Sequence, residues 1–142
     1  MIQLSLKIAT PEKLVYDEKE LDSVTLPTSE GEITILPNHI PLVVKIVPGE
    51  VITRRKGSEN VMVTMQGFMH LDKSGNIVVL SDYAIRSEDV VLAKVEDAKK
   101  KAESTMKEKT SEKDFRVAEA ELRKTLLELK VAQKRRGMNV RV

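Results

Sequence analysis

The 142-residue chain contains no cysteine and only two histidines, His39 and His70. Disulfides and thiolate chemistry are therefore excluded, and a zinc site built from cysteine and histidine ligands is nearly excluded. Aromatic side chains make up only 3% of the residues, so no aromatic platform for stacking nucleic-acid bases is visible. The longest uncharged apolar run, residues 40–44, falls far short of the roughly 20 residues that a membrane-spanning helix needs.

Motifs for catalysis and targeting are missing as well. The chain has no glycine-rich phosphate loop, no G-x-S-x-G elbow and no H-E-x-x-H pair. Glu30 and Glu32 flank Gly31, which is typical of a polar turn entering a strand, and His39 lies in a Pro-Asn-His-Ile-Pro turn. The first residues show no basic segment followed by an apolar stretch. We therefore expect a non-enzymatic protein without metal or cofactor, kept in a cytosol-like compartment.

Composition changes sharply near residue 87. Residues 1–86 contain 25 Val, Ile and Thr, whereas residues 87–142 contain 10 and no Ile. The first part carries 9 basic and 11 acidic residues, net −2, and the second carries 15 basic and 11 acidic residues, net +4. β-branched residues favour strands, and the second part is rich in helix formers. The sequence therefore predicts an α+β protein with an all-β domain over 1–86 and a helical domain over 87–142.

The first part alternates between short apolar segments and turns. Period-two alternation is clear near the N-terminus, where apolar Leu4, Leu6 and Ile8 are interleaved with Ser5 and Lys7. The expected strands span 4–9, 13–17, 21–26, 32–36, 42–47, 51–56, 60–69 and 76–81. Many short strands at this spacing are typical of a sandwich or flattened barrel.

The second part predicts two helices joined into an antiparallel hairpin. Ser87 is the expected N-cap of the first helix, Ser111-Glu112-Lys113-Asp114 resembles a capping box for the second, and Gly137 is a plausible stop. The apolar stripes are Val91, Val95, Ala98, Ala102 and Met106, followed by Phe115, Ala118, Leu122, Leu126 and Leu129. Because the stripes are narrow and contain alanine, we expect a hairpin of marginal stability that docks on the β domain or opens toward another partner.

Basic residues form two clusters, Lys99–Lys101 and Lys134–Arg136. Acidic residues are interleaved with both clusters. A solvated helix face is therefore the plainest interpretation, an acidic protein partner is the second, and nucleic acid is the third.

The stretch VTLPTSEGEITILPNHIPLVVKIVPG, residues 24–49, resembles the signature of epsilon subunits of F-type ATP synthases. The shared order is a Gly-Glu pair ending at Glu32, a short apolar strand, Pro-x-His ending at His39, Pro-Leu at 41–42 and Pro-Gly at 48–49. Further matches occur at Gly67-Phe68, 79–82 and 84–86, so the resemblance covers essentially the full length.

The resemblance implies a non-catalytic rotor subunit on the cytoplasmic face of a bacterial inner membrane, attached to the membrane only through its complex. Its sandwich would bind the gamma subunit and the c-ring, with Glu32, His39, Pro41 and Leu42 as contact residues. Its hairpin would extend along gamma and inhibit ATP hydrolysis, with basic residues meeting an acidic segment of the beta subunit. By charge and helix position, those basic residues are Arg116, Arg123, Lys124, Lys130, Lys134, Arg135 and Arg136.

One departure from the family concerns ATP. Some members bind ATP through a motif of Ile or Leu, Asp, two variable residues, Arg and Ala at the start of the hairpin. Here Val90 and Val91 stand at the first two positions, and Lys94 and Val95 at the last two. Valine cannot accept a hydrogen bond and lysine lacks the planar fork of arginine, so we expect weak or absent ATP binding. An ATP-sensing module and a nucleic-acid-binding module with a basic helical arm remain the alternatives.

Overall fold

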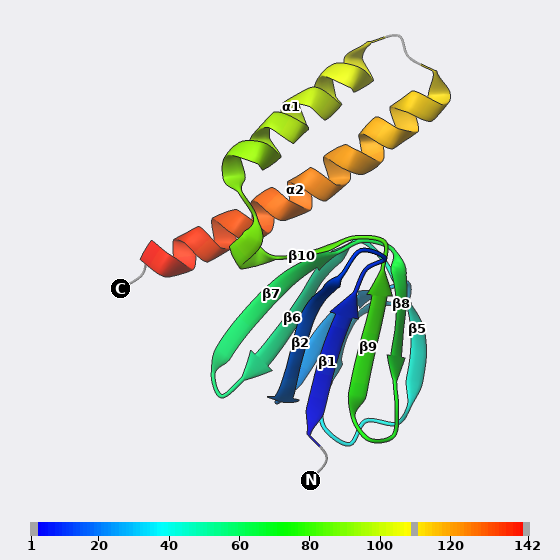
Figure 1. Cartoon of the computed structure of the whole chain (residues 1–142), viewed down its shortest axis with the longest axis vertical. Helices are drawn as coiled ribbons and strands as arrows, with labels where there is room; N and C mark the ends of the chain where they lie inside the picture. The colour runs from blue at the N-terminus through cyan, green and yellow to red at the C-terminus, as the bar shows by residue number, and fades with distance from the viewer. Residues whose placement is uncertain (1–2, 109–110, 141–142) are drawn as a thin grey trace. The chain divides into compact units, whose positions relative to one another are not determined.

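The computed structural model describes residues 3–108 and 111–140, apart from the side chains of residues 93 and 135–140 (Figure 1). It divides into two compact units, Met1–Arg86 and Ser87–Val142. The first is built from strands and the second from helices, so the predicted α+β class, with strands followed by a helical hairpin, is confirmed.

The first unit contains ten short strands. They are β1 (Leu4–Ala9), β2 (Leu14–Leu21), β3 (Ser23–Thr28), β4 (Gly31–Ile35), β5 (Leu42–Ile46), β6 (Gly49–Arg55), β7 (Ser58–Thr64), β8 (Gly67–Leu71), β9 (Asn76–Ser81) and β10 (Ala84–Arg86). Hydrogen bonding connects them in the order β10-β7-β6-β3-β5-β8-β9-β1-β2, with β4 paired to β3.

The sheet bends back on itself and forms a flattened barrel. β3 pairs with two strands along its length. Ser23–Thr25, in its first half, pair with β6, whereas Thr28, at its end, pairs with Ile46 of β5. At the other end of the strand order, Tyr16 of β2 reaches across to β6, and its hydroxyl lies 2.9 Å from Thr53 Oγ1. The Arg86 guanidinium lies 6.0 Å from the centroid of the Tyr16 ring.

The interior of the barrel is filled by large aliphatic side chains. Residues of alternating position on β1, Leu4, Leu6 and Ile8, are fully buried, as the period-two alternation predicts. Ile46 and Met69 contribute from other strands to the same cluster. This core belongs entirely to residues 1–86.

Two strand predictions were wrong. The expected single strand over 60–69 is two strands, because the chain leaves β7 at Met65 and enters β8 at Gly67, which pairs with different neighbours. The Met65 amide donates to the Tyr83 carbonyl oxygen and to Ser81 Oγ, which holds this crossing in place. β10, only three residues long, carries too short a pattern to be predicted.

The second unit is a hairpin of η1 (Ser87–Asp89), α1 (Leu92–Lys107) and α2 (Glu112–Val140), with α1 and α2 side by side (Figure 1). The prediction that Ser87 caps the first helix was wrong, because Ser87 opens the short 3₁₀ turn and Val91 precedes α1 without a side-chain cap. Ser111 does cap α2, since its Oγ accepts a hydrogen bond from the Asp114 amide at 3.2 Å. Gly137 does not stop α2, because one glycine costs a helix only about 1 kcal/mol relative to alanine.

The buried residues of the second unit include both small and larger side chains. Val95 and Ala102 of α1 are buried, and the buried residues of α2 are Ala118, Thr125, Glu128, Leu129, Val131 and Ala132. The predicted stripe on α2 is buried at Ala118 and Leu129 but was wrong at Phe115 and Leu126, which are exposed. Thr125, about 100° from Leu126 around the helix, is buried instead.

Candidate functional site

The predicted sandwich contacts lie at opposite ends of β4. Glu32 follows the β3–β4 turn at the beginning of the strand, whereas the turn 36–41 begins where the strand ends. Glu32 and Leu36 are four positions apart along the extended chain, which corresponds to about 13 Å at a rise of roughly 3.3 Å per residue. The structure therefore does not bring Glu32 together with His39, Pro41 and Leu42.

The end that carries Glu32 is a tight polar turn. The Thr28 hydroxyl donates to the Gly31 carbonyl oxygen and accepts a hydrogen bond from the Glu30 amide. Gly31 has a φ of +105°, a conformation that L side chains rarely adopt, so glycine is required here. Glu30 and Glu32 are both exposed, which leaves two carboxylates free to meet a polar partner.

The other end is a stiff turn with an apolar surface. The His39 amide donates to the Leu36 carbonyl oxygen, and the imidazole Nδ1–H donates to the Ile40 carbonyl oxygen at 2.7 Å. Asn38 takes a left-handed conformation, with φ at +71°. The side chains of Leu36 and Ile40 are 57% and 76% exposed. Sequence reasoning pointed to His39, yet these two neighbours offer more apolar surface, and His39 shapes the backbone that presents them.

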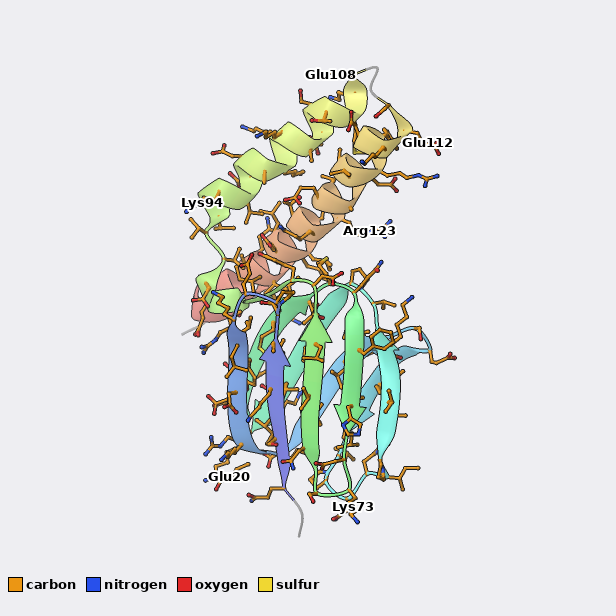
Figure 2. The ribbon with its side chains drawn as sticks, turned by 45° about the vertical axis from the view of Figure 1, so that its right-hand side comes forward. Glu20, Lys73, Lys94, Glu108, Glu112 and Arg123 are labelled. Atoms are coloured by element: carbon orange, nitrogen blue, oxygen red, sulfur yellow. The ribbon has the colours of Figure 1, made fainter. Side chains whose placement is uncertain are left out.

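A second turn lies beside this one, because Leu42 pairs with Leu71 at the end of β8. In the turn 72–75, the Asp72 carboxylate accepts hydrogen bonds from the Asn76 amide, the Asn76 side chain and the Ser74 amide. The bonds from Asn76 and then Ser74 lower the pKa of Asp72. Figure 2 shows Lys73 and Glu20 at this same end of the barrel.

The outer face of β5, β8 and β9 carries an exposed apolar surface that the sequence did not single out as a site. Val43, Phe68 and Leu80 are 68%, 61% and 59% exposed. Phe68 pairs directly with Leu80 across β8 and β9. Beside them is an open groove of about 610 Å³. An alternation count could have flagged Phe68 and Leu80, since each lies between two inward-facing positions.

The predicted basic residues of α2 are partly paired within their own helix. Three cations face a glutamate one turn away: Arg116–Glu112 at 2.7 Å, Arg123–Glu119 at 3.8 Å and Lys124–Glu121 at 3.4 Å. The two arginine side chains are largely exposed, whereas that of Lys124 is only 24% exposed. Lys130 and Lys134 are exposed further along α2. The side chains of Arg135 and Arg136 lie outside the described residues.

The degenerate ATP motif surrounds the start of α1. Val91 is half exposed and precedes the helix with extended backbone angles, whereas Lys94 is exposed and Val95 is buried. Closer to the hairpin turn, an open hollow of about 540 Å³ lies between α1 and α2, with Ala102 and Ala118 among its walls. The motif positions themselves offer no carboxylate or guanidinium to a nucleotide.

Two classes of site are missing from the described part of the chain. Among residues 3–108 and 111–140, no three His, Asp or Glu side chains gather into a possible metal site. Within the same residues, no helix combines the length and apolarity needed to cross a membrane.

Comparison with known proteins identifies the family of the chain. Residues 3–87 match the family model for the β-sandwich domain of the ATP synthase delta/epsilon chain. The chain belongs to the ATP synthase delta/epsilon chain family. The ATP synthase epsilon chain of Dehalococcoides mccartyi is 39% identical over 137 residues, 96% of each chain. That of Desulforamulus reducens is 38% identical over 128 residues, 90% of this chain and 96% of the relative.

Solved structures share the fold at lower identity. A chain of the Euglena gracilis mitochondrial ATP synthase, in a structure of its OSCP, F1 and c-ring, superposes with a TM-score of 0.76 at 21% identity, over 94% of this chain and 82% of that one. A chain from the central stalk and c-ring structure of the Tetrahymena thermophila enzyme has a TM-score of 0.56 at 12% identity, over 92% and 96%. Both likenesses concern the fold alone.

Proposed function

We propose that the chain is a non-catalytic epsilon subunit of the central stalk of a bacterial F-type ATP synthase, on the cytoplasmic face of the inner membrane. In this proposal the sandwich binds gamma and the c-ring and helps to couple rotation to ATP synthesis, while the hairpin inhibits ATP hydrolysis. The observation that carries it is the match to an epsilon chain over 96% of both sequences, which includes the strand unit and the hairpin together.

The strand unit suits a role in transmitting torque. Its core is continuous and filled by fully buried aliphatic side chains, so the unit resists deformation. Its two contact regions, Glu32 at one end and the turn with His39, Pro41 and Leu42 at the other, would allow it to touch two neighbours at once.

The hairpin suits an inhibitory role that depends on opening. Ala102 and Ala118 supply little buried area, so separating the helices costs less than separating strands of the barrel. Exposed ion pairs along a helix stabilise it by only about 0.3–0.5 kcal/mol each. An acidic segment of the beta subunit would therefore exchange partners with Arg116 and Arg123 at small cost. The proposal also includes the other basic residues of the predicted set, namely Lys124, Lys130, Lys134, Arg135 and Arg136.

The test is ATP hydrolysis by an epsilon-depleted bacterial F1 complex, with subunits added back. The full chain should bind and slow hydrolysis, whereas residues 1–86, which contain their whole hydrophobic core, should bind without slowing it. In the full chain, Arg123→Gln should weaken inhibition. Lys100→Gln, at an exposed lysine of α1 outside the proposed set, is the matched control and should leave inhibition unchanged.

Two results would count against the proposal. If the full chain binds and hydrolysis is unaffected, the hairpin is not an inhibitor, although the rotor role stands. If the full chain binds neither the complex nor its cognate gamma subunit, the rotor role itself is wrong.

A further inference from the structure

We infer that two copies of the chain, outside any complex, pair through α2, with the two helices antiparallel and related by a two-fold axis at the level of Glu121. The face of α2 that pairs is mostly exposed, and we call it the outer strip. Its members are three apolar residues, Phe115, Leu122 and Leu126, and four charged ones, Glu112, Glu119, Arg123 and Lys130. The pairing goes beyond the proposed rotor role and does not depend on it.

The apolar members form a row along the helix. At about 100° per residue, Phe115, Leu122 and Leu126 fall within about 40° of one another around α2. The side chains of Phe115 and Leu126 are 40% and 46% exposed, and Leu122 is partly buried. The buried residues Ala118 and Thr125 lie about 60–80° from the middle of this row. The row is therefore beside the buried face of the helix, and an exposed row of large apolar side chains is typical of an interaction site.

The charged members lie along the other side of the outer strip. Four exposed residues fall within about 40° of one another around the helix, namely Glu112, Glu119, Arg123 and Lys130. Figure 2 shows Glu112 and Arg123 on the same side of α2, the side away from α1. The first half of the outer strip is therefore acidic and the second half is basic.

The spacing of these charges is symmetric about Glu121. Glu119 and Arg123 lie two positions either side of it, and Glu112 and Lys130 lie nine positions either side. A two-fold axis at this level places each residue opposite the one at the same spacing on the other side of Glu121, and it turns the same flank of both helices inward. Glu119 then faces the partner's Arg123, and Glu112 faces the partner's Lys130, each contact occurring twice.

The same register brings the apolar side chains together. Phe115 lies within one position of the partner's Leu126, an offset of about 1.5 Å along the axis. The two copies of Leu122 lie two positions apart, about 3 Å along the axis. Packed helices have axes about 8–10 Å apart, so side chains at these levels touch. One register therefore satisfies the charges and the apolar row at once.

The charge order favours a second copy over other partners. A second copy supplies the opposite charge at all four charged positions, whereas a partner of one charge sign opposes only two of them. Lys130 has no ion-pair partner among the described residues, and pairing supplies one. Arg123 lies 3.8 Å from Glu119 of its own helix, and its guanidinium has donors for a second carboxylate. Because Arg123 and Lys130 also belong to the proposed inhibitory set, pairing would cover them until the subunit joins its complex.

Sedimentation equilibrium of the full chain tests the pairing. The original chain should form a dimer whose fraction rises with protein concentration and falls as salt is added, because the facing charges are exposed. Glu119→Arg should weaken the dimer at least about tenfold, because two like-charged contacts replace two attractive ones. Glu121→Arg is the matched control and should change it less than about twofold. Glu121 is as exposed as Glu119 and also pairs with a cation of its own helix, but it lies about 200° away around α2.

A mixing experiment tests the register. Arg123→Glu should be a monomer at concentrations where the original chain is a dimer. Mixed with Glu119→Arg, it should form a heterodimer, since every arginine at 119 and 123 then faces a glutamate. The double variant Glu119→Arg, Arg123→Glu should regain the homodimer, because its charge order is reversed but still complementary to itself. Phe115→Ser should weaken the original dimer about tenfold through the lost aromatic contact.

Four results would overturn the pairing. An original chain that stays monomeric at low salt up to its solubility limit would do so, as would a mixture of the two single variants that does not pair. A dimer that Glu119→Arg leaves unchanged uses another surface, and so does one that Glu121→Arg disrupts equally. Circular dichroism checks that each variant keeps its helices, which we expect because the substituted side chains are exposed. Hydrolysis by the complex is measured separately, so the proposed function stands or fails on its own test.

Discussion

The two units of the chain differ in how many large aliphatic side chains they bury. The strand unit buries large aliphatic side chains such as Leu6, Ile46 and Met69 completely. The helical unit buries fewer large aliphatic side chains, namely Val95, Leu129 and Val131, beside three alanines and the polar residues Thr125 and Glu128. Because the hydrophobic contribution scales with the apolar area removed from water, the strand unit gains far more from packing per residue.

This difference shows that the two units are held together by different kinds of contact. Contacts in the strand unit are mostly between residues distant in sequence, so no single strand separates without disrupting its neighbours. Contacts along α2 include exposed ion pairs within one helix, which survive if the two helices part. These local contacts do not depend on the interface between the helices, whereas strand pairing depends on the neighbouring strands.

The largest expected effect is in the strand unit. Gly67→Ala places a Cβ against the Leu80 carbonyl oxygen and should lower the free energy of unfolding by about 3 kcal/mol. Chemical denaturation followed by circular dichroism measures this. Gly57→Ala is the control, because nothing lies within 4 Å of its added Cβ and only its φ of +82° is unfavourable, at about 1 kcal/mol. Equal losses of unfolding free energy at the two positions would show that β8 and β9 can move apart enough to accept the added Cβ.

The second effect is on the closure of the barrel. Tyr16→Phe removes the hydroxyl that lies 2.9 Å from Thr53 Oγ1, and Thr53 is almost fully buried. The unfolding free energy should fall by about 1–2 kcal/mol. The same denaturation experiment measures it, and an unchanged value would mean that the Thr53 hydroxyl finds another partner.

Tyr16 also predicts a dependence on pH. Burial raises the pKa of its phenol above the ordinary value of 10.0, so the folded state favours the protonated form. Its contribution to stability is then complete below pH 10 and is lost as the pH rises through the folded-state pKa. Unfolding midpoints between pH 8 and about 11 should fall more steeply for the original chain than for Tyr16→Phe. If the unfolding midpoints of the two proteins fall equally with pH, ionisation of Tyr16 does not contribute to the loss of stability.

A smaller effect tests the interior of the hairpin. Thr125 is buried, and its hydroxyl donates to the Leu122 carbonyl oxygen at 2.9 Å. Thr125→Val should stabilise the closed hairpin by about 0.5 kcal/mol, because more apolar area is buried, and should reduce inhibition of hydrolysis. Hydrogen exchange of α1 and α2 amides measures the stability. Thr105→Val, at a less buried hydroxyl that also bonds a carbonyl oxygen in its own helix, should have almost no effect. Reduced protection in Thr125→Val would show that its hydroxyl stabilises the interface.

A still smaller effect concerns the ion pairs of α2. Glu112→Gln breaks the exposed pair with Arg116 and should cost less than about 0.5 kcal/mol at low salt and almost nothing at high salt. Lys113→Gln, next to the pair, is the control. A loss above about 1 kcal/mol would mean that the pair belongs to a larger network.

No effect at all is expected from ATP. Differential scanning fluorimetry of the full chain with millimolar ATP should show no shift, since Val91 and Lys94 replace the Asp and Arg of the ATP motif. The triple variant Val91→Asp, Lys94→Arg, Val95→Ala should acquire a shift, with Val95→Ala alone as its control. A clear stabilisation of the original chain would overturn the prediction.

Local patterns predicted most of the fold. Alternation over β1 and the turn residues around 48–49 and 73–75 placed several strands within a residue or two, because each signal is local. Prediction failed at Met65, where the chain changes neighbours inside an apolar stretch. It also failed at two helix ends. Ser87, a favourable N-cap residue, opens the short 3₁₀ turn instead of α1, and α2 continues past Gly137.

The candidate site residues were also predicted only in part. Motif resemblance selected Glu32 and His39, yet it could not show that they lie at opposite ends of β4. It also passed over Ile40, because exposure of an apolar residue depends on which strands surround it.

The sequence by itself determined the class of the protein, the order of strands before helices and the absence of thiol chemistry. These follow from composition and short-range periodicity, which are properties of the local sequence and do not depend on how distant segments pack. Only the tertiary structure decided that Phe68 and Leu80 face outward side by side and that Glu32 and His39 are apart. Those relations depend on strand register, which is set by pairing between segments far apart in the chain.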